Sequence, residues 1–179
     1  MKWILVILIA IVVLVAVVVV LGALVPRDHV AGASITLRQP PETVWQAIRD
    51  LGAVPQWWPE TKTSVRTADK DGLERWEQNV GGLTMAMLVE TDERPRRLVT
   101  RIDALPGAAF GGSWTYEIAP APDGSRVTVT ERGWIANPLF RFLSRFVFGY
   151  YATQEQYLKA LGRKFGETVA PVRAPASGA

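Results

Sequence analysis

The chain has 179 residues, enough for one domain of ordinary size with appendages, and it contains no cysteine, which excludes disulfides and thiolate metal sites. Its net charge of +3 is small and is not gathered on one basic face, so we expect no nucleic-acid partner. The single histidine, His29, precedes the region where we expect the domain to begin, which disfavours most histidine-dependent catalysis. No carboxylate pair has the spacing of a metal site, and we expect neither metal nor cofactor.

An unbroken apolar run occupies the N-terminus from Trp3 to Val25, flanked by Lys2 and Arg27. As a helix it would be about 34 Å long, slightly more than the ~30 Å hydrocarbon core of a bilayer. A cleaved signal peptide is the alternative, since Ala31-Gly32-Ala33 resembles a cleavage site, but signal peptides have apolar cores of about 7–15 residues. We predict a retained single-pass anchor over residues 1–25. The charge at the Lys2 end favours a cytoplasmic N-terminus and an extracytoplasmic domain.

The first part of the domain predicts a strand followed by short helices. After a short linker at residues 26–32, residues 33–38 alternate between apolar and polar side chains, which is typical of a strand. Residues 42–51 place their apolar side chains on one face and predict an amphipathic helix. The segment 54–59, which is closed by a proline, predicts a compact turn or a second short helix.

The middle of the chain changes to a period of two residues. Six segments show this alternation, at residues 62–67, 73–80, 83–91, 97–103, 113–119 and 126–134. Turn signals separate them, among them Asp71-Gly72, Gly81-Gly82 and Asp123-Gly124. Short strands joined by tight turns predict an antiparallel meander.

The last predicted element is a long helix from Asn137 to about Phe165. Asn137 is a favourable N-cap, and Pro138 suits the first helical position. Apolar residues then recur at steps of three and four, which predicts one continuous helix of more than seven turns. Its first half is apolar almost all round, so it needs a large concave partner. The tail at residues 168–179 is rich in proline and small residues and is predicted to be disordered.

The order of these elements resembles the START-like, or SRPBCC, superfamily, which includes polyketide cyclase/dehydrase-like and lipid-transfer proteins. The opening Ile35-Thr36-Leu37 followed by Pro41-Glu42-Thr43-Val44-Trp45 resembles the entry of that superfamily, and the Trp57-Trp58-Pro59 turn and the closing helix add to it. The similarity covers about residues 33–167. It implies an α+β helix-grip fold, in which a curved antiparallel seven-stranded sheet wraps around the long C-terminal helix and an apolar cavity.

Strand alternation and this resemblance together define the candidate ligand-binding residues. Aromatic and methionine side chains suit adaptable apolar pockets. The candidates are Trp76, Gln78, Met85, Met87, Trp114, Tyr116 and Glu131 on the strands, with Phe142, Phe146 and Tyr150 on the helix, which also offers Tyr157. The residues alone are explained equally well by core filling, and the resemblance implies that some of them line a cavity.

Glu131 is the sharpest candidate for chemistry. It alternates with Val127 and Val129, so strand geometry directs it inward, where an ionised carboxylate is costly unless it is paired. It could be a general acid or base, or an anchor for a ligand headgroup. A structural role is the alternative, either through a bulge near Gly133 that turns it to solvent or through a pair with Arg101.

Three functions remain open at this point. We favour a membrane-anchored, non-catalytic domain that binds a lipid or an isoprenoid-like molecule in an internal apolar cavity. The second is a polyketide cyclase/dehydrase-like enzyme in which Glu131 or Tyr116 transfers a proton. The third is a membrane-bound regulatory or structural subunit whose cavity is filled by its own side chains.

Overall fold

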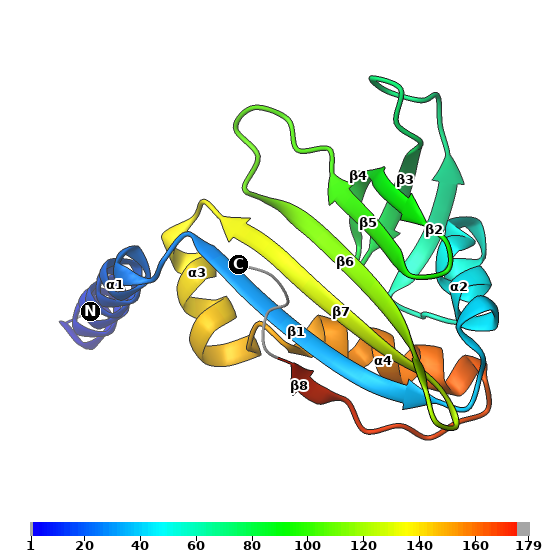
Figure 1. Ribbon diagram of the computed structural model, residues 1–179. Helices are drawn as coiled ribbons and strands as arrows, with labels where there is room; N and C mark the ends of the chain where they lie inside the picture. The colour runs from blue at the N-terminus through cyan, green and yellow to red at the C-terminus, as the bar shows by residue number, and fades with distance from the viewer. Residues whose placement is uncertain (1, 175–179) are drawn as a thin grey trace.

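The computed structural model describes residues 2–174 and consists of a projecting helix and a curved sheet that wraps around a second long helix (Figure 1). The elements are α1 (Lys2–Leu24), β1 (Asp28–Leu37), α2 (Pro41–Arg49), the 3-10 helix η1 (Leu51–Gln56), β2 (Thr61–Arg66), β3 (Arg75–Val80), β4 (Leu83–Glu93), β5 (Arg97–Ile102), β6 (Phe110–Ala121), β7 (Gly124–Ile135), α3 (Pro138–Leu143), the π-helical turn η2 (Ser144–Phe148), α4 (Ala152–Lys164) and β8 (Val172–Ala174).

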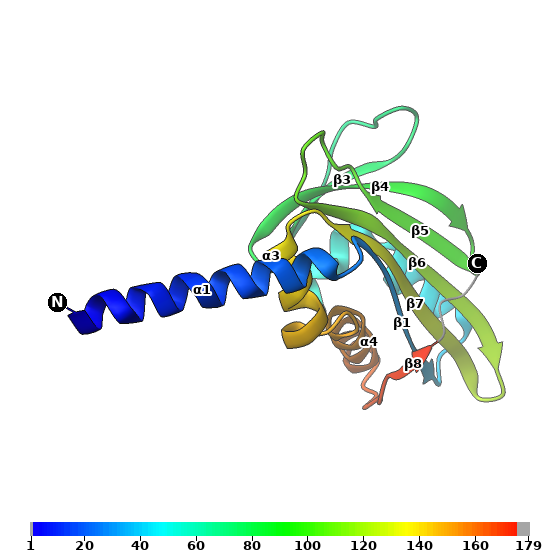
Figure 2. The ribbon, with the colours of Figure 1, turned by 90° about the vertical axis from the view of Figure 1, so that its left-hand side faces the viewer.

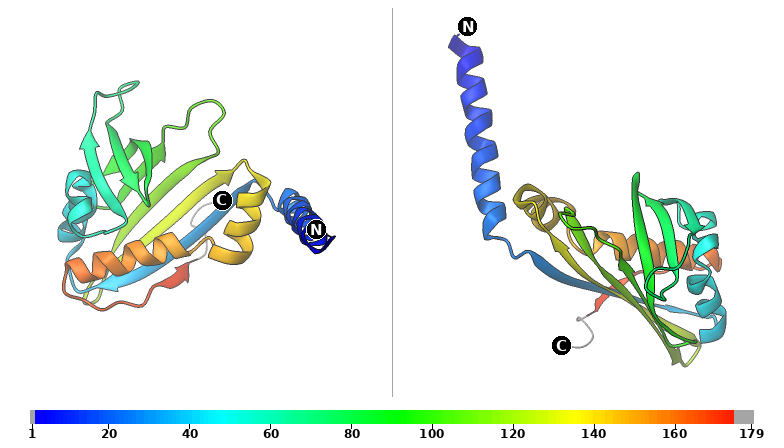
Figure 3. Two further views of the ribbon diagram at one scale, coloured as in Figure 1. Left: turned by 180° about the vertical axis from the view of Figure 1, so that it is seen from behind. Right: turned by 90° about the horizontal axis from the view of Figure 1, so that it is seen from above.

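The sheet confirms the predicted meander and the helix-grip fold. Its strand order is β2-β3-β4-β5-β6-β7-β1-β8, and each neighbouring pair is antiparallel. Strand β1 returns to pair with β7 along its whole length, from Asp28 opposite Trp134 to Leu37 opposite Ser125. The hairpins from β2 to β7 follow one another along the chain, whereas β1 and β8 are joined to the meander by long connections. The right-hand view of Figure 3 shows how strongly the sheet curves.

Two boundaries differ from the prediction. Strand β1 begins at Asp28, so most of the expected linker at residues 26–32 is part of the sheet. In the tail that was expected to be disordered, Val172–Ala174 forms β8 and pairs with Gly32–Ser34 of β1. This pairing adds an eighth strand to the seven that were predicted. The rest of that tail, residues 175–179, lies outside the described residues.

The core lies between the sheet and the helices α2 and α4. Leu98, Val127 and Val129 of the sheet are fully buried, and Leu158 and Leu161 of α4 are buried against the sheet's concave side. Each such side chain stabilises the fold by roughly 1.5–3 kcal/mol through removal of apolar surface from water. The core therefore fixes α4 to the sheet and defines the interior in which a ligand site was expected.

The prediction of one continuous helix from Asn137 to Phe165 is wrong. The segment divides into α3, the turn η2 and α4, with Gly149 between the last two at a φ of 78°. A residue with a Cβ rarely adopts this backbone conformation, so glycine is suited to the break. The left-hand view of Figure 3 shows α3 and α4 as separate helices at an angle to each other. The apolar residues of α3 consequently do not continue the buried face of α4.

Helix α1 stands clear of the domain except at its C-terminal end, where it packs on α3 (Figure 2). Gly22 makes this contact possible, because a Cβ at this position would lie only 2.0 Å from the carbonyl oxygen of Pro138. Arg141 of α3 donates from Nη1 to the oxygen of Val25 at 3.3 Å and from Nη2 to that of Ala136 at 2.7 Å. A guanidinium at this position satisfies a free carbonyl and complements the negative end of the helix dipole.

Candidate functional site

A small cavity lies in the interior of the grip. Its volume is about 30 Å³, and it is lined by Leu51, Val54, Trp58, Gln78, Met87, Thr100, Tyr116 and Tyr157. One water molecule needs about 10–15 Å³ by this measure, so the space admits one or two. Three predicted residues, Gln78, Met87 and Tyr116, meet here as expected. This cavity, whose wall is mostly apolar with a few polar groups, is too small for a lipid.

An aromatic cluster around Tyr157 fills the rest of the interior. The ring centroid of Tyr157 lies 5.0 Å from that of Trp58, 5.7 Å from that of Trp114 and 5.5 Å from that of Tyr116. Two of these contacts are edge-to-face, a geometry worth about 0.5–1.5 kcal/mol beyond area burial. Burial raises the pKa of both Tyr116 and Tyr157, and the hydroxyl of Tyr157 donates a hydrogen bond to that of Tyr116. Both phenols therefore stay protonated at neutral pH and cannot serve as bases.

Glu131 points inward as predicted, but its partners were not foreseen. Gln154 of α4 donates a short hydrogen bond from Nε2 to Oε2 of Glu131, and Nε2 of His29 lies 3.5 Å from Oε1. The alternative of a pair with Arg101 is not formed, because Nε of Arg101 donates to Glu90 at 2.5 Å. Glu131 thus joins the sheet to α4 through a polar contact.

His29 is the residue that sequence reasoning missed. It belongs to β1, and its ring stacks on Tyr150 with the centroids 4.3 Å apart and the planes at 11°. Gly133 on the paired strand makes room for it, since a Cβ there would lie 2.6 Å from Cε1 of the imidazole. The signal was present in the chain, because His29 shares the inward parity of Ala31 and the buried odd-numbered residues that follow it.

The histidine and the glutamate form the one imidazole–carboxylate pair among residues 2–174. Nδ1 of His29 and Oε1 of Gln154 are both buried without a hydrogen-bond partner in the described chain. A pair of this kind is suited to proton transfer. Neither of the two cavities described in this section is lined by these residues.

The other predicted residues divide between the core and the surface. Trp114 belongs to the aromatic cluster, Trp76 packs at the edge of the core, and Met85 is half-buried on β4. Phe142 and Phe146 do not reach the interior, because α3 and η2 lie outside the grip. Phe142 lies beside Gly22 of α1, and Phe146 is 62% exposed.

A larger cleft lies at the end of the domain from which α1 projects. It has a volume of about 480 Å³ and is lined by Arg27, Leu105, Gly107, Ala108, Trp134, Ala136 and Arg141, none of which was predicted as a site residue. The ring of Trp134 is held between Gly111, where a Cβ would come within 2.7 Å of it, and the guanidinium of Arg27, 4.6 Å from the ring centroid. The loop between β5 and β6 and the start of α3 close the cleft.

Exposed apolar side chains lie at the end of α1, in one wall of the cleft and on the α3–η2 segment. They are Leu24, Leu105, Phe140, Phe146, Val147 and Phe148, and Leu105 and Phe148 are 71% and 66% exposed. Apolar side chains exposed on segments that pack together, as α1 and α3 do, suit contact with a membrane or another apolar partner. Below we call these six residues the apolar rim.

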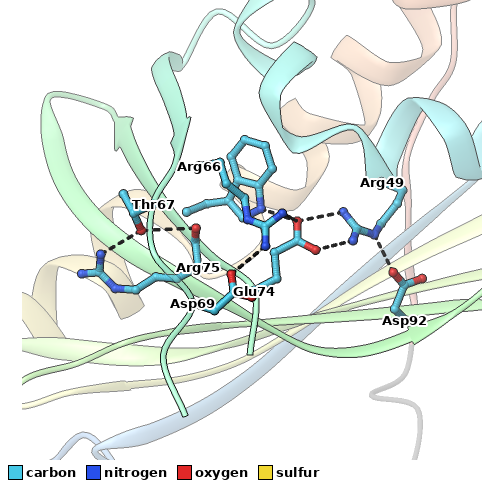
Figure 4. A network of polar contacts seen from close by, with 8 residues as sticks. Arg49, Arg66, Thr67, Asp69, Glu74, Arg75 and Asp92 are labelled. Atoms are coloured by element: carbon cyan, nitrogen blue, oxygen red, sulfur yellow. Dashed lines mark hydrogen bonds and ion pairs between the residues drawn. The ribbon is translucent and has the colours of Figure 1, made fainter. Parts of the chain in front are cut away.

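The opposite end of the sheet is closed by a network of ion pairs (Figure 4). Arg49 at the end of α2 contacts Glu74 at 2.5 Å and Asp92 at 2.7 Å. Burial raises the pKa of Glu74, but the hydrogen bonds donated by Arg49 and Trp76 outweigh it and hold this pKa below its ordinary value. The network ties α2 to β4 and to the residue that precedes β3, and it has the character of a structural clamp.

Comparisons with known proteins agree with this architecture. The family described as polyketide cyclase/dehydrase and lipid transport matches residues 29–164. The chain belongs to this family. The matched region runs from β1 to α4. It includes His29 and all residues that line the two cavities except Arg27. No curated protein matches the chain.

Solved structures of the same fold come from several bacteria. A START superfamily protein from Mycobacterium smegmatis is 18% identical, with 78% of this chain and 97% of that chain aligned and a TM-score of 0.56. A protein from Thermus thermophilus is 23% identical over 76% of this chain and 95% of its own, with a TM-score of 0.57.

The similarity also extends to one half of a larger protein. The di-domain ARO/CYC StfQ from the steffimycin biosynthetic pathway is 11% identical, with 78% of this chain and 52% of that chain aligned and a TM-score of 0.59. The chain thus spans about half the length of StfQ. At these identities the likeness establishes the helix-grip fold and not the activity.

Proposed function

We propose that the protein is a membrane-tethered, non-catalytic domain that binds an amphipathic small molecule, of the lipid or isoprenoid class, at the bilayer surface. The observation that carries this proposal is the position of the large cleft. It lies at the base of α1, and Leu105 of the apolar rim forms part of its wall. A ligand could therefore pass between the bilayer and the cleft without crossing water.

The retention of α1 as an anchor is supported by its contacts with the domain. Helix α1 has 23 residues, long and apolar enough to span a bilayer, and a signal sequence would pass the same test. Cleavage near Ala31-Gly32-Ala33, however, would cut inside β1, where all three residues are buried. It would also remove Gly22, which packs on α3, and Val25, whose carbonyl oxygen accepts a hydrogen bond from Arg141. The charge at Lys2 favours an extracytoplasmic domain.

We assign the ligand to the cleft and not to the interior. Small-molecule sites in proteins occupy about 300–1,000 Å³. The cleft, at about 480 Å³, falls in this range, whereas the interior cavity of about 30 Å³ is roughly ten times too small. The interior thus has the filled core of the subunit hypothesis, and ligand binding would take place beside it.

The test is native mass spectrometry of the full chain released from lipid nanodiscs. Ala108 lines the cleft, and Ala108→Trp should fill it and reduce the number of retained lipids to that of α1 alone. Met87→Trp, which fills the interior cavity, serves as the matched control and should leave retention unchanged. Loss of lipid in Met87→Trp with retention in Ala108→Trp would assign the ligand to the interior and overturn the proposal.

An enzyme is the second candidate, and the His29–Glu131 pair is the observation that favours it. Catalysis would require the imidazole to meet a substrate, which its burial against Tyr150 prevents. Hydrogen–deuterium exchange at the Cε1 position of His29 measures this accessibility directly. We expect exchange much slower than in the denatured chain, whereas exchange at the denatured rate would favour the enzyme.

A further inference from the structure

The charge of the membrane-proximal cleft comes from two arginines. Arg27 and Arg141 are the charged residues among the seven that line it, and no lining residue is acidic. Within residues 2–174 neither of them forms an ion pair with a carboxylate; their recorded partners are an aromatic ring and main-chain carbonyls. The cleft therefore carries two positive charges that the described chain does not neutralise.

The neutral partners fix the position of each guanidinium without removing its charge. Arg141 donates two hydrogen bonds to main-chain carbonyls, and its Nε is buried without a partner in the described structure. Arg27 lies over the ring of Trp134, which Gly111 supports from behind. A guanidinium held in one orientation suits the planar, two-pronged recognition of phosphate oxygens.

The position of the cleft along the chain decides what kind of anion can reach it. Leu24 ends α1, and the three residues to Arg27 can span at most about 10 Å. The polar layer on each side of the hydrocarbon core is about 5–8 Å thick. With α1 across the bilayer, Arg27 and Trp134 would lie at headgroup depth, where tryptophan and arginine are favoured.

From this juxtaposition we infer that the cleft binds the anionic phosphate headgroup of a bilayer lipid between Arg27 and Arg141, while the acyl chains rest on the apolar rim. The inference rests on the proposed function and specifies its ligand class. A free phosphate ion has the same oxygen chemistry, but it would leave the apolar rim uncovered.

The experiment offers the full chain a choice between two lipids. The protein is placed in nanodiscs of equimolar phosphatidylglycerol and phosphatidylcholine with identical acyl chains, and the lipids retained after release are identified by native mass spectrometry. An arginine near an anionic surface favours binding by about fivefold, so we expect at least this enrichment of phosphatidylglycerol over the bulk ratio. Arg27→Gln should reduce the enrichment by about fivefold, whereas Arg27→Lys should keep most of it.

Two control variants separate the cleft from general attraction of lipid to the helix. Arg126→Gln removes an exposed arginine near the other end of β7 and should leave the enrichment unchanged. Ala108→Trp blocks the cleft without changing the charge and should abolish the enrichment. Enrichment that survives in both Ala108→Trp and Arg27→Gln would overturn the inference, because it would arise from lipids around α1.

The remaining outcomes distinguish this inference from the proposed function. Retained lipid at the bulk ratio would overturn headgroup recognition and leave the proposed function standing. Absence of retained lipid would contradict both. Release of phosphatidylglycerol by inorganic phosphate at equal concentration would identify a site for a free anion and overturn the assignment to a lipid.

Discussion

The two ends of the sheet use arginine in different ways. At the α2 end, Arg49 is held by two carboxylates, Glu74 and Asp92, so that its charge is compensated within the fold. At the α1 end, Arg27 lies over the ring of Trp134, and Arg141 donates to two main-chain carbonyls. No carboxylate among the described residues compensates the charge of either arginine. The first arrangement is complete by itself and the second is suited to an anionic partner. A net charge of +3 for the whole chain conceals this difference, because it reports a sum and not a position.

The short helices at the two ends show the same contrast in apolar surface. Helix α2 buries Val44, Trp45 and Ile48 against the sheet. The α3–η2 segment leaves Phe140 and Phe148 more than half exposed beside the base of α1. The apolar face of α2 is thus covered by residues of the same chain. The other segment leaves apolar side chains exposed, which a bilayer could cover if α1 spans it.

The largest effect should follow from breaking the clamp at the α2 end. Glu74→Ala removes the shared partner of Arg49 and Trp76 and should lower the free energy of unfolding by about 2 kcal/mol. Denaturant unfolding of the detergent-solubilised full chain measures this change. Asp69→Ala is the matched control, because Asp69 is 54% exposed, and it should cost less than about 0.5 kcal/mol. Equal effects of the two variants would mean that the clamp is not structural.

A smaller effect is expected where α1 meets α3. Gly22→Leu places a side chain against Pro138 and should force the helices apart at a cost of about 1 kcal/mol. Tryptic cleavage after Arg141 in nanodisc-embedded protein should then accelerate, because α3 loses its support. Ala23→Leu adds the same side chain at the neighbouring, exposed position and should leave the cleavage rate unchanged. An unchanged rate in Gly22→Leu would show that α1 and α3 do not depend on each other.

Acid should weaken the clamped end first. The pKa of Glu74 lies below its ordinary value of 4.5, for the reasons given above, and the hydrogen bond from Lys70 lowers the pKa of Asp103. A carboxyl group with a lower pKa in the folded than in the unfolded state stabilises the fold above its ordinary pKa, and this stabilisation is lost as the pH falls through the folded value. Unfolding free energy should therefore decline below about pH 4.5, and Glu74→Gln should flatten the decline. An unaltered pH profile in that variant would contradict the assignment.

The smallest effect on stability should come from the arginine in the cleft. Arg27→Gln removes a single exposed cation over Trp134 and should change the free energy of unfolding by less than about 0.5 kcal/mol. The measurement is the same denaturant titration that tests Glu74→Ala. A loss comparable to that of Glu74→Ala would make Arg27 a structural residue, and the contrast between the two ends would then disappear.

Much of the sheet could be predicted because apolar and polar residues alternate along a strand that has one buried and one exposed face. Alternation located β2 to β7 and gave the inward direction of Glu131, which the contact with Gln154 confirms. The partner itself could not be predicted, since Gln154 lies on a helix whose position depends on tertiary packing. His29 was placed outside the domain because the first residues of β1 lack a clear alternation of apolar side chains.

The closing helix shows where the period of apolar residues becomes ambiguous. When seven of the ten residues from Leu139 to Phe148 are apolar or aromatic, steps of three and four can be found on several faces. The pattern therefore continued through Gly149, although the backbone there leaves the helical region. For the same reason Phe142 and Phe146 were assigned to the interior. The cleft was missed because its seven residues come from four separate segments of the chain.

The short strand β8 has a consequence for copies of this protein that are anchored in the same membrane. A tether would confine many copies to one plane with their sheets at a common height, and an uncovered strand edge would then invite edge-to-edge pairing between neighbours. Val172–Ala174 covers β1 at Gly32–Ser34, on the side of the sheet from which α1 departs. Val172–Ala174 thereby leave less of the β1 edge open to such pairing, and a change that displaced them would uncover Gly32–Ser34.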